Sequence, residues 1–393
     1  MMKRIFSLLL LVSMLCLALA SCGETDLDKS KEYLEKNPLV DSNPKETLTF
    51  CLVTDTAIDN AALLAMQASF NKLLEVSDRT HLQFVNWTTA EYAAKLNEKL
   101  AAVKAARESA TAGGTATPSK KNEYPRVLDT QFDIILVTSY EMLTSLIQSE
   151  QIADLTDLMD KKYYGLLKND GVTASFLTSA KVDGKTYGVP NCNVLGEYTY
   201  LLVDKAYAEH YGYLISTDFT DWESTAALRA AIEAAPAEGA YHYDFAEDPY
   251  DVDAPVRLVK GSYADRTVYG SGCYLYVEEK PIVNKSELFK SMLAVSSYSV
   301  DVSRAMEIIY EINTDKALRT ILEYGVENTT YELNNGIVTL KDNSAYAYAV
   351  NPLYTGNVFA LYPTAATKDL VAGWRIHNAE ITFVDDITPP AAQ

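Results

Sequence analysis

The sequence predicts an α/β fold with a mostly parallel sheet, divided into two lobes. Short buried runs alternate with helical patterns in the first 150 residues, which is typical of helices packed on a parallel sheet. The chain has 393 residues, 48% of them hydrophobic, which is enough for two lobes. A stiff turn followed by an extended segment lies halfway along the chain, where a hinge between lobes is expected.

The first half of the chain supplies the alternation. Three apolar or β-branched runs predict strands, at residues 48–54, 81–87 and 132–138. The third run is continuously apolar, as in a central parallel strand. Between them, residues 57–76 and 91–107 carry apolar side chains at helical spacing. Ser139 then stands where the N-cap of a third helix belongs.

The middle of the chain carries the candidate hinge. Asp183-Gly184 predicts a hairpin-type turn, because its second corner requires a residue that tolerates positive φ. The following Val-Pro pair excludes a helix and forces an extended backbone. Residues 198–203 are aromatic and β-branched, so they predict a strand. We expect the hinge at Gly188, Val189 and Pro190.

The second half returns to the same pattern. Residues 292–297 predict a strand that re-enters the first lobe, and Asp301 and Asp315 are placed to cap two helices, the second ending at Gly325. Three other segments have less pattern. They are a flexible insertion, a short helix and a solvated acidic loop, at residues 109–122, 222–235 and 247–253.

The first 21 residues have the order of a secretory signal peptide. A Lys-Arg pair precedes an apolar stretch at residues 5–19 that is too short to span a bilayer. The stretch ends Leu-Ala-Ser-Cys, which resembles the lipobox of bacterial lipoproteins. That resemblance implies lipidation of Cys22, with residues 22–46 as a flexible tether. The alternative is an ordinary cleaved signal with an incidental cysteine.

Charge and motif content narrow the function classes. The formal net charge of −19 argues against nucleic acid or an anionic membrane surface as a partner. The four histidines are isolated from one another, and neither a metal-ligand spacing nor a nucleophile–base motif is present, so we expect no metal, no cofactor and no catalysis. Cys51, Cys192 and Cys273 are expected to be buried free thiols, although one pair could form a disulfide.

Several segments resemble the extracellular solute-binding proteins of ABC importers. The run Gly184-Lys-x-Tyr187-Gly188-Val189-Pro190 resembles the first crossing between the lobes of that family. Further similar segments follow in the family's order, at residues 304–309, 322–327 and 354–363. The resemblance implies a two-lobe, type II periplasmic-binding-protein-like fold. Lobe 1 would comprise residues 47–189 and 293–345, and lobe 2 residues 190–292 and 346–393. Because members of the family continue further, we expect a second lobe that is reduced or truncated.

The candidate ligand-binding residues lie where such folds bind ligands. Open α/β sheets hold ligands outside the carboxyl ends of their parallel strands. Side chains at those ends, and those that follow the predicted hinge, offer acids, amides and aromatic faces, which suit the hydroxyls and C–H faces of a sugar. They are Asp55, Trp87, Ser139, Tyr140, Asn191, Asn193, Glu197 and Tyr198.

These observations and the resemblance together imply a lipid-anchored solute-binding protein. It would capture a small solute, a carbohydrate rather than a peptide, and deliver it to the transmembrane subunits of an ABC permease. Its place would be the extracellular face of the cell membrane, or the periplasmic side in a host with an outer membrane. Two alternatives stay open from the sequence. One is an exported glycan hydrolase, and the other is a surface lipoprotein that acts as a scaffold or sensor without a working cleft.

Overall fold

The computed structural model describes most of the chain after residue 45. The described residues are 46–78, 80–111, 127–210, 254–341 and 344–388, with isolated positions at 226, 230, 234, 245 and 246. The chain divides into a unit of residues 1–44 and a unit of residues 45–393. The predicted signal peptide, Cys22 and the tether up to residue 45 lie outside the described residues. So do most of the predicted insertion, most of the short helix and the whole acidic loop.

A five-stranded sheet, here called the central sheet, organises the described chain. Its strand order is β2-β1-β3-β10-β4. β1 pairs in parallel with β2 and with β3, and β10 runs antiparallel to both β3 and β4. The predicted α/β fold with a mostly parallel sheet is therefore confirmed. The strands are β1 (Glu46–Thr54), β2 (Thr80–Thr88), β3 (Ile134–Val137), β4 (Gly188–Pro190) and β10 (Met292–Val295).

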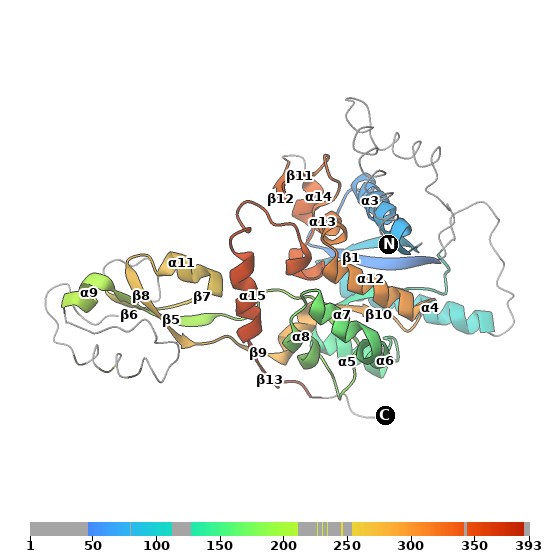
Figure 1. Ribbon diagram of the computed structural model, residues 1–393. Helices are drawn as coiled ribbons and strands as arrows, with labels where there is room; N and C mark the ends of the chain where they lie inside the picture. The colour runs from blue at the N-terminus through green and yellow to red at the C-terminus, as the bar shows by residue number, and fades with distance from the viewer. Residues whose placement is uncertain are drawn as a thin grey trace. The chain divides into compact units, whose positions relative to one another are not determined.

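The longer helices pack on this sheet and on one another (Figure 1). They are α3 (Asn60–Asp78), α4 (Thr89–Thr111), α5 (Tyr140–Gln148), α12 (Val302–Thr314) and α13 (Lys316–Tyr324). All three predicted caps are confirmed, because Ser139, Asp301 and Asp315 each accept a backbone N–H of the helix that follows. Gly325 ends α13 at φ +89°, a conformation that favours glycine.

A second sheet lies in the middle of the chain, with strand order β6-β7-β5-β8. β5 pairs antiparallel with β7 and β8, which confirms the strand predicted at residues 198–203. The rings of Tyr198 and Tyr200 stack at 5.3 Å within it. Its elements are β5 (Tyr198–Asp204), α9 (Lys205–His210), β6 (Phe245–Ala246), β7 (Val256–Gly261), η2 (Tyr263–Asp265), α11 (Arg266–Tyr269) and β8 (Cys273–Glu279).

Shorter elements complete the described chain. Two small sheets pair β11 (Tyr331–Asn334) with β12 (Ile337–Leu340), and β9 (Ile282–Asn284) with β13 (Thr382–Val384). The remaining helices are α6 (Thr156–Leu158), η1 (Met159–Tyr163), α7 (Tyr164–Asn169), α8 (Ala174–Ser179), η3 (Lys285–Lys290), α14 (Ala345–Ala349), η4 (Pro352–Tyr354), η5 (Val358–Ala360) and α15 (Val371–Glu380). Among the described helices, none has the length and apolar character that a membrane span requires.

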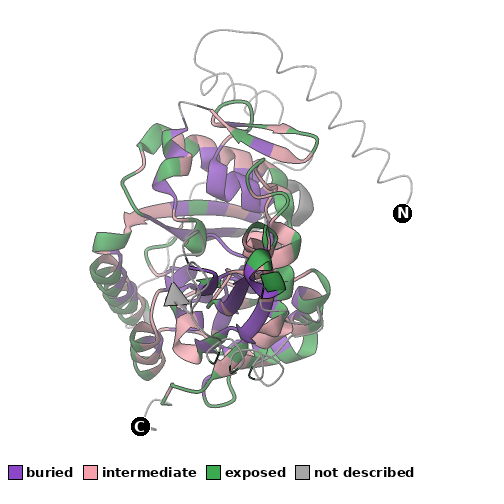
Figure 2. Cartoon of the chain, turned by 90° about the vertical axis from the view of Figure 1, so that its left-hand side faces the viewer, coloured by how far each residue is buried: buried purple, intermediate pink, exposed green. Residues whose placement is uncertain are grey.

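One large hydrophobic core surrounds the central sheet, whose strands are mostly buried (Figure 2). Tyr346, Val350 and Phe359 belong to this core. Tyr346 is fixed there because its hydroxyl donates to the carbonyl of Leu322 in α13, at 2.9 Å. The core therefore includes part of the segment that the sequence analysis assigned to lobe 2, and the lobe boundaries otherwise stay a prediction.

The turn before the expected hinge has the predicted form. Asp183 and Gly184 have φ of 50° and 75°, and Val182 and Lys185 exchange backbone hydrogen bonds of 2.9 and 3.0 Å. The hinge residues themselves form β4 and are buried beside β10. A side chain at Gly188 would meet the carbonyl oxygen of Leu293 at 2.5 Å. A hinge at residues 188–190 stays a prediction.

The three described cysteines are free and buried, as expected from the sequence. Burial raises the pKa of Cys51, Cys192 and Cys273. None of them is therefore activated as a thiolate nucleophile by its surroundings.

Asp133 is a fully buried carboxylate that joins three parts of the hydrophobic core around the central sheet. Its Oδ2 accepts from the backbone N–H and hydroxyl of Thr49 on β1, at 2.8 and 2.9 Å, and from Gln131 at 2.9 Å. Its Oδ1 accepts from the Ser299 hydroxyl and the Val300 N–H, at 2.7 and 3.0 Å. The carboxylate thus fixes the start of β3 to β1 and to the turn after β10.

Replacing this carboxylate should cost much of the stability of the protein. In Asp133→Ala five donors lose their acceptor, three of them in the buried core, so we expect the free energy of unfolding to fall by about 3 kcal/mol. Urea denaturation measures this change. Asp129→Ala, at an exposed position nearby in the chain, is the matched control and should change stability little. Equal effects of the two substitutions would contradict the assignment.

Candidate functional site

The carboxyl edge of the central sheet collects several polar side chains. β1 ends at Thr54, β2 at Thr88 and β4 at Pro190, and these strands run in the same direction. Because β10 runs the opposite way, its beginning, with Ser291 just before it, lies at the same edge. Residues that follow three strands and precede a fourth are therefore brought together.

Asp55 is the exposed acid at the end of β1. Its Oδ1 accepts from the hydroxyl of Thr89, at 3.2 Å, and from the side-chain amide of Asn351, at 3.0 Å. The amide oxygen of Asn351 in turn accepts the backbone N–H of Leu353, at 3.0 Å. One oxygen of the carboxylate is therefore held by the first residue of α4 and by the N-cap residue of η4.

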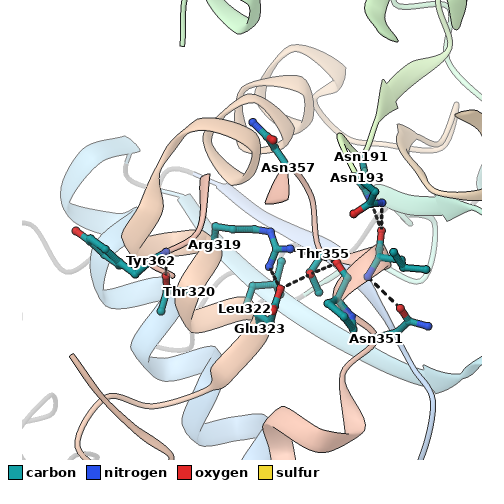
Figure 3. Close-up of polar contacts among 12 residues, drawn as sticks. Asn191, Asn193, Arg319, Thr320, Leu322, Glu323, Asn351, Thr355, Asn357 and Tyr362 are labelled. Carbon is teal, nitrogen blue, oxygen red and sulfur yellow. Dashed lines mark hydrogen bonds and ion pairs between the residues drawn. The ribbon is translucent and has the colours of Figure 1, made fainter. Parts of the chain in front are cut away.

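The carbonyl of Leu353 in η4 binds side chains that follow β4, the strand at the far end of the sheet from β2. It accepts from the side-chain amides of Asn191 and Asn193, at 3.2 and 3.1 Å (Figure 3). It also accepts the hydroxyl of Ser291, which in turn accepts from Asn191 at 2.8 Å. Three of the predicted site residues thus meet in one connected set, here called the edge network. Its members are Asp55, Thr89, Asn191, Asn193, Ser291, Asn351 and Leu353.

A buried ion pair on α13 contacts both ends of η4. Arg319 and Glu323 lie one turn apart on α13, with side chains 0% and 8% exposed, and they contact each other directly (Figure 3). Arg319 also donates to the carbonyl of Pro352 at 3.2 Å, and Glu323 accepts the hydroxyl of Thr355 at 3.2 Å. Both ends of η4 are therefore tied to α13 through charged groups.

The turn after η4 packs closely against α12. Gly356 has φ +108°, and a side chain there would meet Cγ2 of Ile312 at 2.9 Å. Asn357 next caps η5 and donates to the carbonyl of Asn313, at 3.0 Å. Contacts of Gly356 and Asn357 with α12 thus hold the segment that carries Asn351 and the Leu353 carbonyl.

Aromatic and apolar surface borders the edge network. Tyr354 is partly buried, and burial together with the nearby charge of Asp55 raises its pKa. Tyr348 and Leu353 are 70% and 51% exposed. Tyr348 precedes Ala349, whose carbonyl accepts the backbone N–H of Asp55 at 2.8 Å. The carboxylate thus lies near Tyr354, and the exposed Tyr348 and Leu353 belong to the two segments that hydrogen-bond to Asp55.

A hollow of about 280 Å³ lies along the chain passages between the two sheets. The backbone of Gly196 packs closely against β9 there, since a side chain at this position would meet Cγ2 of Val283 at 2.7 Å. Glu197 follows as an exposed residue. The same two passages carry Asn191 and Asn193, and Ser291. The hollow is lined by Leu195, Gly196, Ile282, Val283, Asn284 and Glu287.

The other predicted site residues have structural contacts of their own. Trp87 packs against Tyr92 and Phe132, with ring centroids 6.2 and 5.8 Å apart. Ser139 uses its hydroxyl to accept the N–H of Met142, at 3.1 Å. The structure does not bring these residues into the edge network, and their role in ligand binding stays a prediction.

The two predicted tyrosines also point elsewhere. Tyr140 donates to the carbonyl of Thr388 at 2.5 Å, and burial with Asp385 and Asp386 raises its pKa. Tyr198 is fully buried in the second sheet, where its hydroxyl donates to Glu380 at 2.5 Å. Burial, Glu380 and Tyr200 raise the pKa of Tyr198 strongly. Both hydroxyls are thus engaged by segments near the end of the chain.

Four members of the edge network were not expected from the sequence, namely Thr89, Ser291, Asn351 and Leu353. Thr89 comes two residues after the strand predicted at residues 81–87, and Ser291 directly precedes the one at 292–297, so their placement near strand ends was a usable signal. Leu353 contributes a backbone carbonyl, for which side-chain identity gives no signal. Within the described chain, no group of three or more His, Cys, Asp or Glu side chains is arranged to hold a metal ion.

Comparison with known proteins decides the fold. No protein-family model matches the chain, and no curated protein does. Solved structures of the N-glycan transport solute-binding protein of Streptococcus pneumoniae do match, the first with a TM-score of 0.51 and 16% identity, over 86% of this chain and 84% of that one. The same protein in complex with Man1GlcNAc matches with a TM-score of 0.50 and 17% identity, over 86% and 84%. The fold is that of an extracellular solute-binding protein.

This likeness fixes the architecture and leaves the ligand open. In the two-lobe solute-binding-protein fold of this chain, the edge network lies at the carboxyl edge of the central sheet. The chain passages at residues 191–197 and 280–291 connect that sheet to the second one. The site thus combines a carboxylate, three amide side chains and a turn that contacts with α13 hold in place.

The buried ion pair should be costly to break from one side only. In Glu323→Ala the Arg319 guanidinium stays buried without its carboxylate, so we expect the free energy of unfolding to fall by about 3 kcal/mol or more. The double variant Arg319→Met/Glu323→Leu removes both charges and should recover a large part of that loss. Urea denaturation of the variants tests this, and a double variant less stable than Glu323→Ala would contradict it.

Proposed function

We propose that this protein binds a small carbohydrate at the edge network and delivers it to an ABC importer. The observation that carries the proposal is the arrangement around Asp55. Its Oδ1 is fixed by Thr89 and Asn351, and among the described residues its Oδ2 accepts no hydrogen bond. An exposed carboxylate oxygen held in one orientation is a strong acceptor for a sugar hydroxyl, and it needs little reordering on binding.

The charges of the network favour an uncharged solute. Its seven members include one carboxylate and no arginine, lysine or histidine. Phosphate or carboxylate groups would meet Asp55 without a compensating cation. Sugar hydroxyls both donate and accept, and they therefore match a carboxylate together with the amides of Asn191, Asn193 and Asn351.

The apolar border supports a sugar over a linear polyol. Tyr348 and Leu353 are largely exposed on the two segments that hydrogen-bond to Asp55, and Tyr354 is next in the chain. A sugar ring presents a C–H face that packs on such surfaces while its hydroxyls reach polar groups. The solved structure with Man1GlcNAc belongs to an N-glycan transport protein of the same fold, which supports this class of solute.

Binding, and not turnover, is the proposed activity. The similar solved structures are solute-binding proteins. A solute that contacts both lobes would stabilise a closed arrangement by its higher affinity for that state. The closed protein would then dock on the transmembrane subunits of an importer, as the resemblance in sequence implies.

Binding can be tested with mannose–N-acetylglucosamine oligosaccharides. We expect the Tm of the protein to rise with sugar concentration, because a ligand of the folded state stabilises it. Asp55→Asn should weaken the affinity about tenfold, since it replaces a charged acceptor by a neutral amide. Asp157→Asn, at a side chain 84% exposed on α6, is the matched control and should bind normally.

Isothermal titration calorimetry measures the affinities of these three proteins. If Asp55→Asn bound as tightly as the parent, the solute would lie elsewhere on the molecule. If no sugar of a broad panel raised the Tm, the proposed carbohydrate-binding function would be wrong.

We also propose that the protein is held at the extracellular face of the membrane by a lipid on Cys22. The signal-like residues 1–21 and the Leu-Ala-Ser-Cys ending support this proposal. Cys22→Ala should release the protein from the membrane fraction, because no thioether can form. Cys16→Ala, six residues earlier in the signal, should leave it membrane-bound. Detergent phase partitioning measures both, and continued membrane binding of Cys22→Ala would contradict the anchor.

A further inference from the structure

Helix α15 contacts both the chain passage after β4 and the second sheet. Asn378 donates to the carbonyl of Asn193, at 2.9 Å. Gly373 lies so close to η2 that a side chain there would meet Cα of Ala264 at 3.0 Å. Glu380 accepts the hydroxyl of Tyr198 on β5 at 2.5 Å. The helix therefore joins the edge network to the second sheet.

His377 lies at the centre of this junction and is fully buried. Its Nδ1 accepts the backbone N–H of Tyr263, the first residue of η2, at 3.1 Å. Its Nε2 is 2.9 Å from the carbonyl oxygen of Leu195. A carbonyl can only accept, so the proton must be on Nε2 and the ring is neutral. The ring also lies edge-on to Tyr198, with centroids 5.1 Å apart.

A second proton on the His377 ring would remove its hydrogen bond with Tyr263. Protonation of Nδ1 would place an N–H opposite the N–H of Tyr263, so the hydrogen bond would be replaced by a repulsion between two donors. The Leu195 contact could persist, because Nε2 keeps its proton. The bond that breaks is therefore the one between α15 and η2 of the second sheet.

We propose that His377 is an acid-sensitive latch, whose protonation releases the η2 turn of the second sheet from α15. The latch goes beyond the proposed sugar binding and does not depend on it. Its parts are one imidazole, the N–H of Tyr263 and the carbonyl of Leu195. Opening would free the turn at residues 262–265, while the Asn378 contact with Asn193 involves no titrating group.

The charged and titratable groups around the latch lie on α15 itself and on the segments packed against it. Arg375 and Glu380 share α15 with His377. The other segments contribute Glu197 from the passage after β4, Tyr198 from β5, Asp265 from η2 and Arg266 from α11. Arg266 lies over the ring of Tyr263 at 4.7 Å, and Lys280 is 3.5 Å from Glu380. Burial lowers the pKa of His377, and it outweighs the carbonyls of Leu195 and Gly196 and the charges of Asp265 and Glu197, which raise it.

This direction sets the pH window. Because the pKa of His377 is lower in the folded than in the unfolded protein, the folded state binds fewer protons. The stabilising contribution of the neutral ring is complete above about pH 6.5, the ordinary histidine value. It is lost as the pH falls through the lowered pKa of the folded state. The latch is therefore closed at neutral pH and opens in acid.

Hydrogen exchange of the Tyr263 amide measures the state of the latch directly. We expect its protection factor, corrected for the intrinsic exchange rate at each pH, to fall at least about tenfold between pH 7.5 and pH 4.5. Amides of β1 should keep their protection over this range and report that the central sheet stays folded. A constant protection factor at Tyr263 would overturn the proposal.

Two variants separate the latch from general effects of acid. His377→Asn places a non-titrating amide oxygen near the position of Nδ1, so protection at Tyr263 should become independent of pH. His81→Asn, on β2, is the matched control and should keep the full acid response. An equal acid response in His377→Asn and the parent would exclude His377 as the titrating group.

A measurement on the unmodified protein covers the case in which His377→Asn does not fold. NMR titration of the imidazole resonances should give His377 a pKa below 6.5, with a midpoint that coincides with the loss of protection at Tyr263. A midpoint above 6.5, or one separated from the amide response, would also overturn the latch. Neither readout requires a solute, so failure of the sugar-binding experiments leaves this test intact.

Discussion

The position of the candidate site depends on one buried ion pair. Arg319 and Glu323 are both on α13 and contact each other. Arg319 also contacts the start of η4, and Glu323 contacts the residue that follows it. Burying two charges costs nearly as much free energy as their attraction returns, so the pair adds little net stability. What it supplies is position. Through Pro352 and Thr355 it fixes a turn whose Leu353 carbonyl accepts three donors from two other segments.

Strand direction decides which residues can reach that turn. The parallel strands β1 and β2 present Asp55 and Thr89 at one edge, and the reversed β10 presents Ser291 there. A sheet with β10 in the parallel direction would have placed Ser291 at the opposite edge. The antiparallel strand β10, between β3 and β4, is therefore part of the site, because it brings the two chain passages together.

The sequence predicted local features well because few neighbouring residues decide them. Ser139, Asp301 and Asp315 cap helices through their own hydroxyl or carboxylate, and Asp183-Gly184 turns through its own backbone. Asp55 was found because it follows a predicted strand, and Asn191 and Asn193 because they follow the predicted hinge. Contacts across the chain were not predictable. Asn191 meets Leu353 162 residues later, and Tyr140 meets Thr388 248 residues later. No local pattern encodes which partner such a side chain finds.

Asn193 connects the two inferred properties of the molecule. Its side-chain amide donates to Leu353 in the edge network, and its carbonyl accepts from Asn378 on α15. Leu195, two residues later, accepts from His377. The segment between β4 and β5 therefore contacts both the edge network and α15. Because Nε2 of His377 keeps its proton, opening of the latch leaves this segment attached to α15 and breaks only the hydrogen bond between α15 and η2.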